Sequence, residues 1–245
     1  ADHDVHVMHE RVALAAIVVA EPLEARRTAG AAAAALAHEF GRVGLKANHL
    51  VTCACGTKPV LKQREKVVPL AQGKVLEIGM GAGHNLPYYD AKRVDTVVGI
   101  DPCATSWRMA QKRASQLGVP LEFVHGSAED MPLPSESFDT VLMTFSLCTI
   151  PDGHAALGEI RRVLKPEGRL VFCEHGEAPD ESVARWQARI NPMWRRLLGG
   201  CNLNRPIVNW IGKAGFGIQS LDQMYLPGTP RIAGFNVWGS AQREC

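Results

Sequence analysis

The chain has 245 residues, of which 46% are hydrophobic and 21% are charged, a composition typical of a globular protein and not of a disordered one. Its formal net charge of +2 gives no electrostatic case for nucleic acid as a partner, because nucleic-acid-binding domains usually concentrate basic residues on one face. Seven cysteines are an odd count for a disulfide framework, so free thiols in a reducing cytoplasm are expected.

The N-terminal part differs from the rest. We expect residues 1–50 to be a helical extension, in part disordered, and residues 51–245 to be the main domain. Alanine-rich residues 24–43 favour a helix, interpreted as an edge helix, with a lid or a membrane-surface helix as the alternative. The apolar run at residues 12–20 is far shorter than the ~20 residues that span a bilayer. We therefore expect a soluble protein, with peripheral membrane contact through the N-terminal segment as the other option.

From residue 74 onward, short apolar segments alternate with helical ones. We predict strands at residues 75–78, 95–100, 121–125, 138–145 and 169–173. We predict helices that begin near His84 or Asn85 and that cover residues 105–117 and 154–164, the last stopped by the proline and glycine of residues 165–168. This alternation indicates a parallel sheet covered on both faces. The ligand of such a sheet is expected at the carboxyl ends of the strands.

A glycine-rich turn, Gly79-Met80-Gly81-Ala82-Gly83, follows the first predicted strand. Glycines let the backbone turn tightly and approach a ligand closely. A dinucleotide fingerprint requires a further glycine at position 84, where His84 stands. Asp101 ends the next strand, where a carboxylate can accept both ribose hydroxyls of a nucleoside. The two features together predict a nucleoside-containing ligand.

The turn and four later segments, taken in order, resemble the class I S-adenosylmethionine-dependent methyltransferases. The four segments are Val98-Gly99-Ile100-Asp101 and residues 126–132, 137–141 and 161–170. The resemblance implies an α/β fold, a doubly wound, Rossmann-like, mostly parallel seven-stranded sheet with helices on both faces. It also implies S-adenosylmethionine as the cofactor and a small-molecule acceptor as the substrate.

The same resemblance implies roles for individual residues. Gly79, Gly81, Ala82 and Gly83 would line the methionine and ribose moieties, and Glu77 would orient the turn and the amino group. The further cofactor-binding positions that the resemblance implies are Asp101, Pro102, Ser127, Ala128, Glu129 and Thr144. Ser127 stands where many members have an aspartate that accepts from the adenine amino group, so Glu129 is the alternative acceptor.

Three C-terminal segments, residues 146–152, 173–175 and 199–205, resemble a group of thiol S-methyltransferases, and residues 53–59 and 62–69 resemble its bacterial relatives. This resemblance implies the sulfur of a thiol or sulfide as the acceptor. His175 is the candidate base, because the ordinary pKa of histidine lies near neutrality. A histidine hydrogen-bonded to the backbone is the alternative for His175. Cys148 is a candidate pocket residue, and structural packing is the alternative for it.

Several alternatives stay open. Cys53-Ala54-Cys55 resembles half of a metal site, but no second Cys/His pair follows at zinc-site spacing, so no metal is predicted. Among methyltransferases, the alternative is an enzyme that acts on a phospholipid, a quinone or a similar small molecule. Outside the methyltransferases, the alternatives are an NAD-dependent oxidoreductase and a non-catalytic cofactor-binding protein. Aromatic residues either wall the pocket or are plain core; they are Tyr88, Tyr89, Trp186, Trp194 and Trp210.

Overall fold

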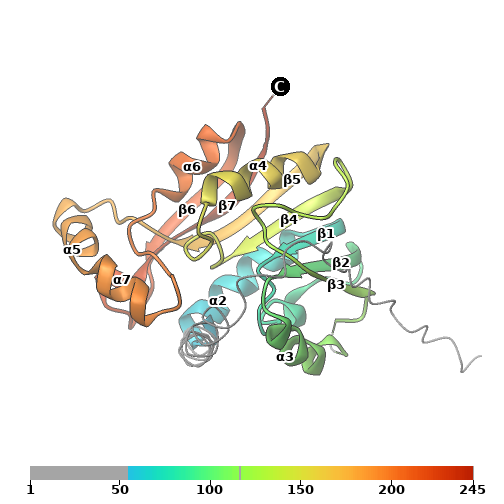
Figure 1. The fold of residues 1–245 in the computed structure, drawn as a ribbon, viewed down its shortest axis with the longest axis horizontal. Helices are drawn as coiled ribbons and strands as arrows, with labels where there is room; N and C mark the ends of the chain where they lie inside the picture. Colours follow the sequence, from blue (N-terminus) through green and yellow to red (C-terminus); the bar gives the residue numbers. More distant parts are fainter. Residues whose placement is uncertain (1–54, 116, 245) are drawn as a thin grey trace, which may run out of the picture.

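The computed structural model describes residues 55–115 and 117–244, which form one seven-stranded sheet with helices on both faces (Figure 1). The helix predicted at residues 24–43 and the domain boundary near residue 50 lie outside the described residues. Among the described residues, no helix is both long and apolar enough to cross a membrane.

The strands, in chain order, are β1 (Gly73–Ile78), β2 (Val94–Asp101), β3 (Leu121–His125), β4 (Phe138–Thr144), β5 (Leu164–His175), β6 (Phe216–Tyr225) and β7 (Phe235–Arg243). Their order in the sheet is β3-β2-β1-β4-β5-β7-β6. The first five strands are parallel, whereas β7 runs antiparallel to both β5 and β6. The predicted fold class is therefore confirmed. The strand order reverses between β1 and β4, which is where ligands bind in open α/β sheets.

Two apolar layers explain why the central strands are continuous hydrophobic runs. On one face, Leu76 and Ile78 of β1 belong to the core cluster that α4 (Gly153–Val163) and α6 (Ile207–Lys213) cover. On the other face, Val75 packs in the cluster formed with α2 (Lys58–Val67), η1 (Val68–Leu70) and α3 (Ala104–Ala114). Successive residues of a strand point to opposite faces, so β1 is buried on both.

The helices α5 (Glu181–Leu197) and α7 (Arg231–Gly234) lie together at one end of the molecule (Figure 1). Both helices belong to the part of the chain after β5, where no individual helix or strand was predicted from the sequence. The hairpin of β6 and β7 and the helices α2, α5 and α6 were thus not anticipated one by one.

The helix predicted to begin near His84 or Asn85 is wrong. The chain forms a turn there, followed only by the 3-10 helix η2 (Leu86–Tyr88). Pro87 disfavours the helical conformation for the preceding residue, and the Asn85 side chain is bound to the buried Glu77.

Two boundaries also differ from the prediction. The predicted break at residues 165–168 belongs to β5, because that strand begins at Leu164, directly after α4. The fourth strand ends at Thr144 and not at Phe145, whose φ of 53° is incompatible with a strand.

Candidate active site

The glycine turn joins β1 to the carboxyl edge of the sheet, and its three glycines all have positive φ, 64° at Gly79, 53° at Gly81 and 71° at Gly83. A Cβ at Gly79 would lie 2.6 Å from Ser146 Oγ, and one at Gly83 would lie 2.8 Å from a Leu86 methyl group. At Gly81 the nearest atom of the described residues, apart from its chain neighbours, would be 3.8 Å away. Packing therefore requires the outer two glycines, whereas the middle one leaves an open cradle beside the backbone.

Asp101 holds the turn against the end of β2. One carboxylate oxygen accepts the Gly81 N–H at 2.9 Å and the other accepts the Cys103 N–H at 2.8 Å. Each oxygen keeps a second lone pair for a ligand hydroxyl. Burial raises the pKa of Asp101, and the two backbone donors oppose that rise. The Asp101 carboxylate therefore lies directly beside the glycine turn, at the end of β2.

Glu77 lies beneath the turn, 1% exposed, inside a buried polar network. Its carboxylate accepts the Tyr89 hydroxyl at 2.7 Å and the Asn85 amide at 3.0 Å. Burial raises the pKa of Glu77 to about 7, against the lowering effect of these donors and of the Arg64 charge. Thr144, which was also predicted to bind the cofactor, belongs to the same network: its hydroxyl oxygen accepts a hydrogen bond from the Asn85 amide at 2.9 Å.

Arg64 of α2 completes this network and was missed by the sequence analysis as an individual residue. Its Nη1 donates to Asn85 Oδ1 and to Thr144 Oγ1, both at 2.6 Å. The side chain is 5% exposed, and its Nε has no hydrogen-bond partner among the described residues. A buried cation with a spare donor fits an anionic group of a ligand. The only sequence signal was its place in residues 62–69, because its contacts lie 21 and 80 residues away.

The predicted adenine segment forms a local cluster. Ser127 Oγ donates to Glu129 Oε2 at 2.8 Å, and the other carboxylate oxygen of Glu129 accepts the Asp152 N–H at 2.6 Å. The neighbouring Ala128 is buried. After β2, the Pro102 carbonyl oxygen lies 2.9 Å from His125 Nε2. The two loops that follow β2 and β3 therefore carry the four predicted residues.

On the other side of the turn, three side chains meet at the ends of β4 and β5. His175 Nε2 lies 3.0 Å from Cys201 Sγ, and Cys201 Sγ lies 3.9 Å from Cys148 Sγ. Cys148 and Cys201 are buried, and His175 is half-buried. Cys201 comes from the loop after α5 and was present in the sequence analysis only within residues 199–205.

Glu174 fixes the loop that carries Cys148. Its fully buried carboxylate accepts the backbone N–H groups of Ser146 at 2.8 Å, Leu147 at 3.1 Å and Cys148 at 3.4 Å. Arg205 donates to the carbonyl oxygens of Leu147 and Ile150 from the opposite side. Burial raises the pKa of Glu174, and the three backbone donors oppose that rise. The loop after β4 is therefore held rigidly between the glycine turn and the thiol cluster.

Comparison with known proteins decides the family. A family model described as a methyltransferase domain matches residues 76–172. Thiol S-methyltransferase TMT1B of Rattus norvegicus is 34% identical over 170 residues, which cover 65% of this chain and 68% of that protein. TMT1B of Homo sapiens is 34% identical over 176 residues, or 67% and 71% of the two chains. The chain belongs to the S-adenosylmethionine-dependent methyltransferases.

Other relatives of this methyltransferase have different acceptors in their names. The phthiotriol/phenolphthiotriol dimycocerosates methyltransferase 1 of Mycobacterium ulcerans is 30% identical over 167 residues, 68% of this chain and 60% of that one. Family membership therefore establishes the enzyme class and S-adenosylmethionine as the methyl donor, and it leaves the acceptor to be argued from the site.

Solved structures agree on the fold. A geranyl diphosphate methyltransferase solved with its methyl donor has a TM-score of 0.59 at 15% identity and covers 75% of this chain and 84% of that one. The [4+2]-cyclase SpnF has a TM-score of 0.58 at 18% identity, with 76% and 80% covered. At such identities the likeness shows the fold of this methyltransferase alone.

Of the aromatic residues singled out in the sequence, Tyr89 and Trp210 make contacts inside the fold of this methyltransferase. Tyr89 is buried and donates to Glu77. Trp210 packs at a tilt against His154, with ring centroids 4.6 Å apart. Trp186 is 56% exposed on α5, so it does not wall the site.

Proposed function

We propose that this methyltransferase transfers the methyl group of S-adenosylmethionine to the sulfur of a small thiol or sulfide. The observation that carries the proposal is the cluster of Cys148, His175 and Cys201 at the carboxyl ends of β4 and β5. Cys148 is two residues from Ser146, whose hydroxyl contacts the strand leading into the glycine turn. Sulfur and imidazole groups thus line the side from which an acceptor would approach. The names of the TMT1B relatives support the same acceptor.

The reaction needs little from the protein beyond alignment. The acceptor thiol loses its proton, its sulfur bonds to the methyl carbon, and the electron pair of the breaking carbon–sulfur bond returns to the donor sulfur. A cation and an anion become two neutral molecules, which a dry pocket favours. Deprotonation of a thiol with a pKa of about 8.5 costs only about 2 kcal/mol at neutral pH. His175 is the group placed to accept that proton.

For the donor, we propose that Gly79, Gly81, Ala82 and Gly83 line its methionine and ribose moieties and that Asp101 binds the ribose hydroxyls. Pro102, Ser127, Ala128 and Glu129 would surround the adenine. Glu77 and Thr144 would act from beneath the turn, through the network that they share with Asn85. The unpartnered Nε of Arg64 supports an added role for this residue as the cation facing the methionine carboxylate.

The acceptor is tested by a methyl-transfer assay with sulfide, methanethiol, larger thiols, amines, quinones and phospholipids, with products identified by mass. We expect methylated thiols, and Asp101→Ala should lower the rate of product formation several-fold at a donor concentration near the wild-type dissociation constant. Methylation of a lipid or quinone without any thiol product would overturn the proposal. Binding of NAD without binding of the methyl donor, or tight donor binding without turnover on any acceptor, would do the same.

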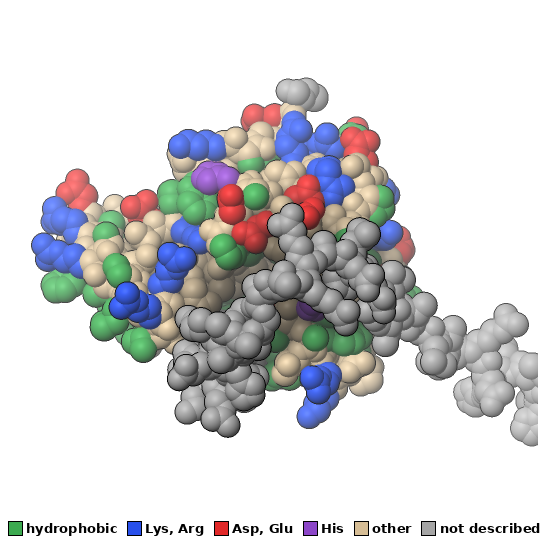
Figure 2. Space-filling view, viewed as in Figure 1, with side chains coloured by type: hydrophobic (Ala, Val, Ile, Leu, Met, Phe, Trp, Pro, Cys, Tyr) green, Lys and Arg blue, Asp and Glu red, His purple; other side chains and the backbone are tan. Residues whose placement is uncertain are grey.

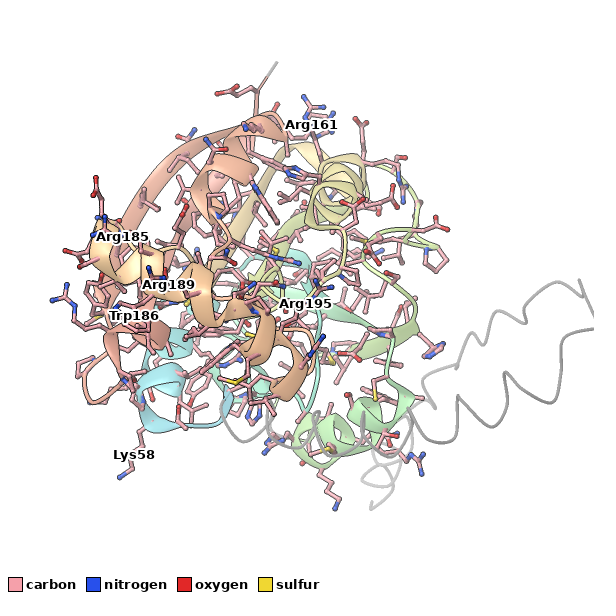
Figure 3. The ribbon with its side chains drawn as sticks, turned by 60° about the vertical axis from the view of Figure 1, so that its left-hand side comes forward. Lys58, Arg161, Arg185, Trp186, Arg189 and Arg195 are labelled. Carbon is pink, nitrogen blue, oxygen red and sulfur yellow. The ribbon has the colours of Figure 1, made fainter. Side chains whose placement is uncertain are left out.

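We also propose that α5 lies against an anionic membrane surface, in addition to any contact made by the N-terminal segment. Trp186, Met193 and Leu197 are 56–63% exposed and are spaced 7 and 4 residues apart, which places them on one stripe of the helix. Four exposed arginines accompany them, Arg185, Arg189, Arg195 and Arg196. Basic, hydrophobic and acidic side chains lie close together at this end of the molecule (Figure 2), and Arg185, Trp186 and Arg189 all come from α5 (Figure 3). This combination is typical of interfacial helices.

A further inference from the structure

We propose that Cys148, His175 and Cys201 form a binding site for a soft divalent cation, with zinc as the best fit, and that the fourth coordination position receives the thiol acceptor as a thiolate. The first half concerns the cluster alone. The second half rests on the proposed function. Neither follows from the spacing of these residues in the sequence, because Cys201 lies 53 residues from Cys148 and 26 residues from His175.

The geometry of the cluster is close to that of a zinc site. The three ligand atoms lie within 4.8 Å of one another. Zinc binds sulfur at about 2.3 Å and nitrogen at about 2.0 Å, so a tetrahedral site places two sulfurs about 3.8 Å apart and a sulfur and a nitrogen about 3.5 Å apart. The two Sγ atoms are 3.9 Å apart and need no movement, whereas the 3.0 Å contact between His175 Nε2 and Cys201 Sγ must open slightly.

The backbone around the two thiols is already held in place without a metal. The Cys148 N–H donates to Glu174. The Cys148 carbonyl accepts both the backbone N–H and the side-chain amide of Asn202, each at 2.9 Å. Asn202 follows Cys201 directly, so these two bonds dock the Cys201 loop onto the Cys148 loop. Hydrogen bonds that orient the ligand-bearing segments are characteristic of metal sites.

The chemistry of the donor set selects the metal and leaves a position open. Two thiolates and an imidazole suit zinc and other soft cations, and not magnesium or calcium. Three protein ligands are the arrangement of catalytic zinc sites, in which substrate or water takes the fourth place. A thiol that coordinates a cation is deprotonated, so with the metal bound the proton would pass to solvent, and His175 would act as a ligand in place of its role as a base. When the thiolate sulfur attacks the methyl carbon, the electron pair of the breaking carbon–sulfur bond returns to the donor sulfur. The methylated thiol is then a neutral thioether, which is a weaker ligand and leaves.

One further thiol lies near the cluster and has to be distinguished from it. Burial raises the pKa of Cys55, and the proximity of Cys201 and Glu174 adds to this rise. Its Sγ is nevertheless not part of the group within 4.8 Å. We therefore assign the fourth position to the acceptor and not to Cys55.

The metal half is tested on the full-length chain by loading with zinc, removing unbound metal by gel filtration and measuring bound metal by mass spectrometry. We expect one zinc per chain and a loss of zinc affinity of about a hundredfold or more in Cys201→Ser, Cys148→Ser and His175→Ala. Cys173→Ser is the matched control, because that buried thiol in β5 contacts Asn236 and not the cluster. Absence of zinc from the wild type, or equal zinc affinity in Cys201→Ser, would overturn the site. A Cys148–Cys201 disulfide in protein purified without oxygen would overturn it as well.

The acceptor half is tested with cobalt in place of zinc, because cobalt bound by thiolates absorbs visible light in a way that reports its ligands. Addition of a simple thiol should change the cobalt spectrum of the wild type and of Cys55→Ser alike. Removal of the metal should abolish thiol methylation while the affinity for the methyl donor stays unchanged. A spectrum that does not respond to any thiol, or loss of metal in Cys55→Ser, would overturn the acceptor half and leave the metal half standing. If the metal binds and the spectrum responds but no thiol is methylated, the proposed function fails independently of the metal site.

Discussion

The hydroxyl of Ser146 donates a hydrogen bond of 2.8 Å to the carbonyl oxygen of Ile78. This contact connects the last residue of β1 before the glycine turn with the loop that leads to Cys148. The Ser146 backbone N–H is held at the same time by Glu174. The donor side and the acceptor side of the site are therefore joined through one buried serine.

Replacement of this serine should loosen that connection. We expect Ser146→Ala to lower the free energy of unfolding by about 1–2 kcal/mol, since a buried carbonyl loses a donor, and to weaken donor binding. Ser137→Ala is the matched control, because its hydroxyl donates to Pro134 at an exposed position. Urea unfolding and calorimetric titration measure the two effects. Equal stability losses in the two variants would contradict the structural role given to Ser146.

Asp101 should be required for donor affinity. Asp101→Ala removes the proposed acceptor of the ribose hydroxyls and also the partner of the Gly81 and Cys103 N–H groups. We expect the dissociation constant for S-adenosylmethionine to rise at least tenfold, or about 1.4 kcal/mol. Asp95→Ala, an exposed acid in the same strand, should leave it unchanged. An unaltered affinity in Asp101→Ala would exclude the ribose role.

Gly81 should tolerate a methyl group in the fold but not in the donor complex. Among residues 55–115 and 117–244, a Cβ there meets no atom closer than 3.8 Å outside its chain neighbours, and the positive φ costs about 1 kcal/mol for any residue with a Cβ. Gly228 has a φ of 74°, and a Cβ at that position would meet none of the same residues within 4 Å, so Gly228→Ala carries the same backbone cost away from the site. Both variants should lose similar stability, and Gly81→Ala alone should lose donor affinity. If titration found the two equal in affinity, the cradle assignment would be wrong.

Glu77 should make the donor-free protein less stable as pH rises through the weakly acidic range. Its pKa of about 7 in the fold exceeds the ordinary 4.5, so the folded state holds the proton longer than the unfolded state. The contribution of Glu77 to the free energy of unfolding therefore falls by about 3 kcal/mol as the pH rises from ~4.5 to ~7, and it is constant above that range. In Glu77→Gln, which cannot ionise, the unfolding free energy should lose this part of its pH dependence. Urea unfolding curves at several pH values that show the same slope in both proteins would refute the assignment.

The apolar stripe on α5 should control membrane binding. Replacement of Trp186, Met193 and Leu197 by serine should reduce co-sedimentation with vesicles that contain phosphatidylserine at least fivefold, and high salt should weaken binding of the wild type. Leu221→Ser removes another exposed apolar side chain, on β6, and should have no effect. Undiminished sedimentation of the triple variant would contradict a lipid contact through α5.

Local pattern in the sequence was enough to predict the strands and the glycine turn around which we propose that the donor binds. The apolar runs of β1, β2 and β4, the glycine turn and Asp101 follow one another along the chain, and each is specified by its own neighbours: strands by continuous burial and turns by glycine. The fold class could be predicted for the same reason. The prediction of a helix near His84 failed because long-range contacts of the Asn85 side chain, to Arg64 and Thr144, competed with the local preference.

Other parts of the proposed site depend on contacts that no local pattern records. Arg64 reaches Thr144 across 80 residues, and Cys201 reaches Cys148 and His175 from a loop beyond α5. β7 also inserts between β5 and β6, an order that alternation of strands and helices does not specify. The sequence by itself therefore determined the enzyme class and its methyl donor. Only the tertiary structure brought two thiols and an imidazole to the same place, because side chains far apart in the chain become neighbours through burial against a shared sheet.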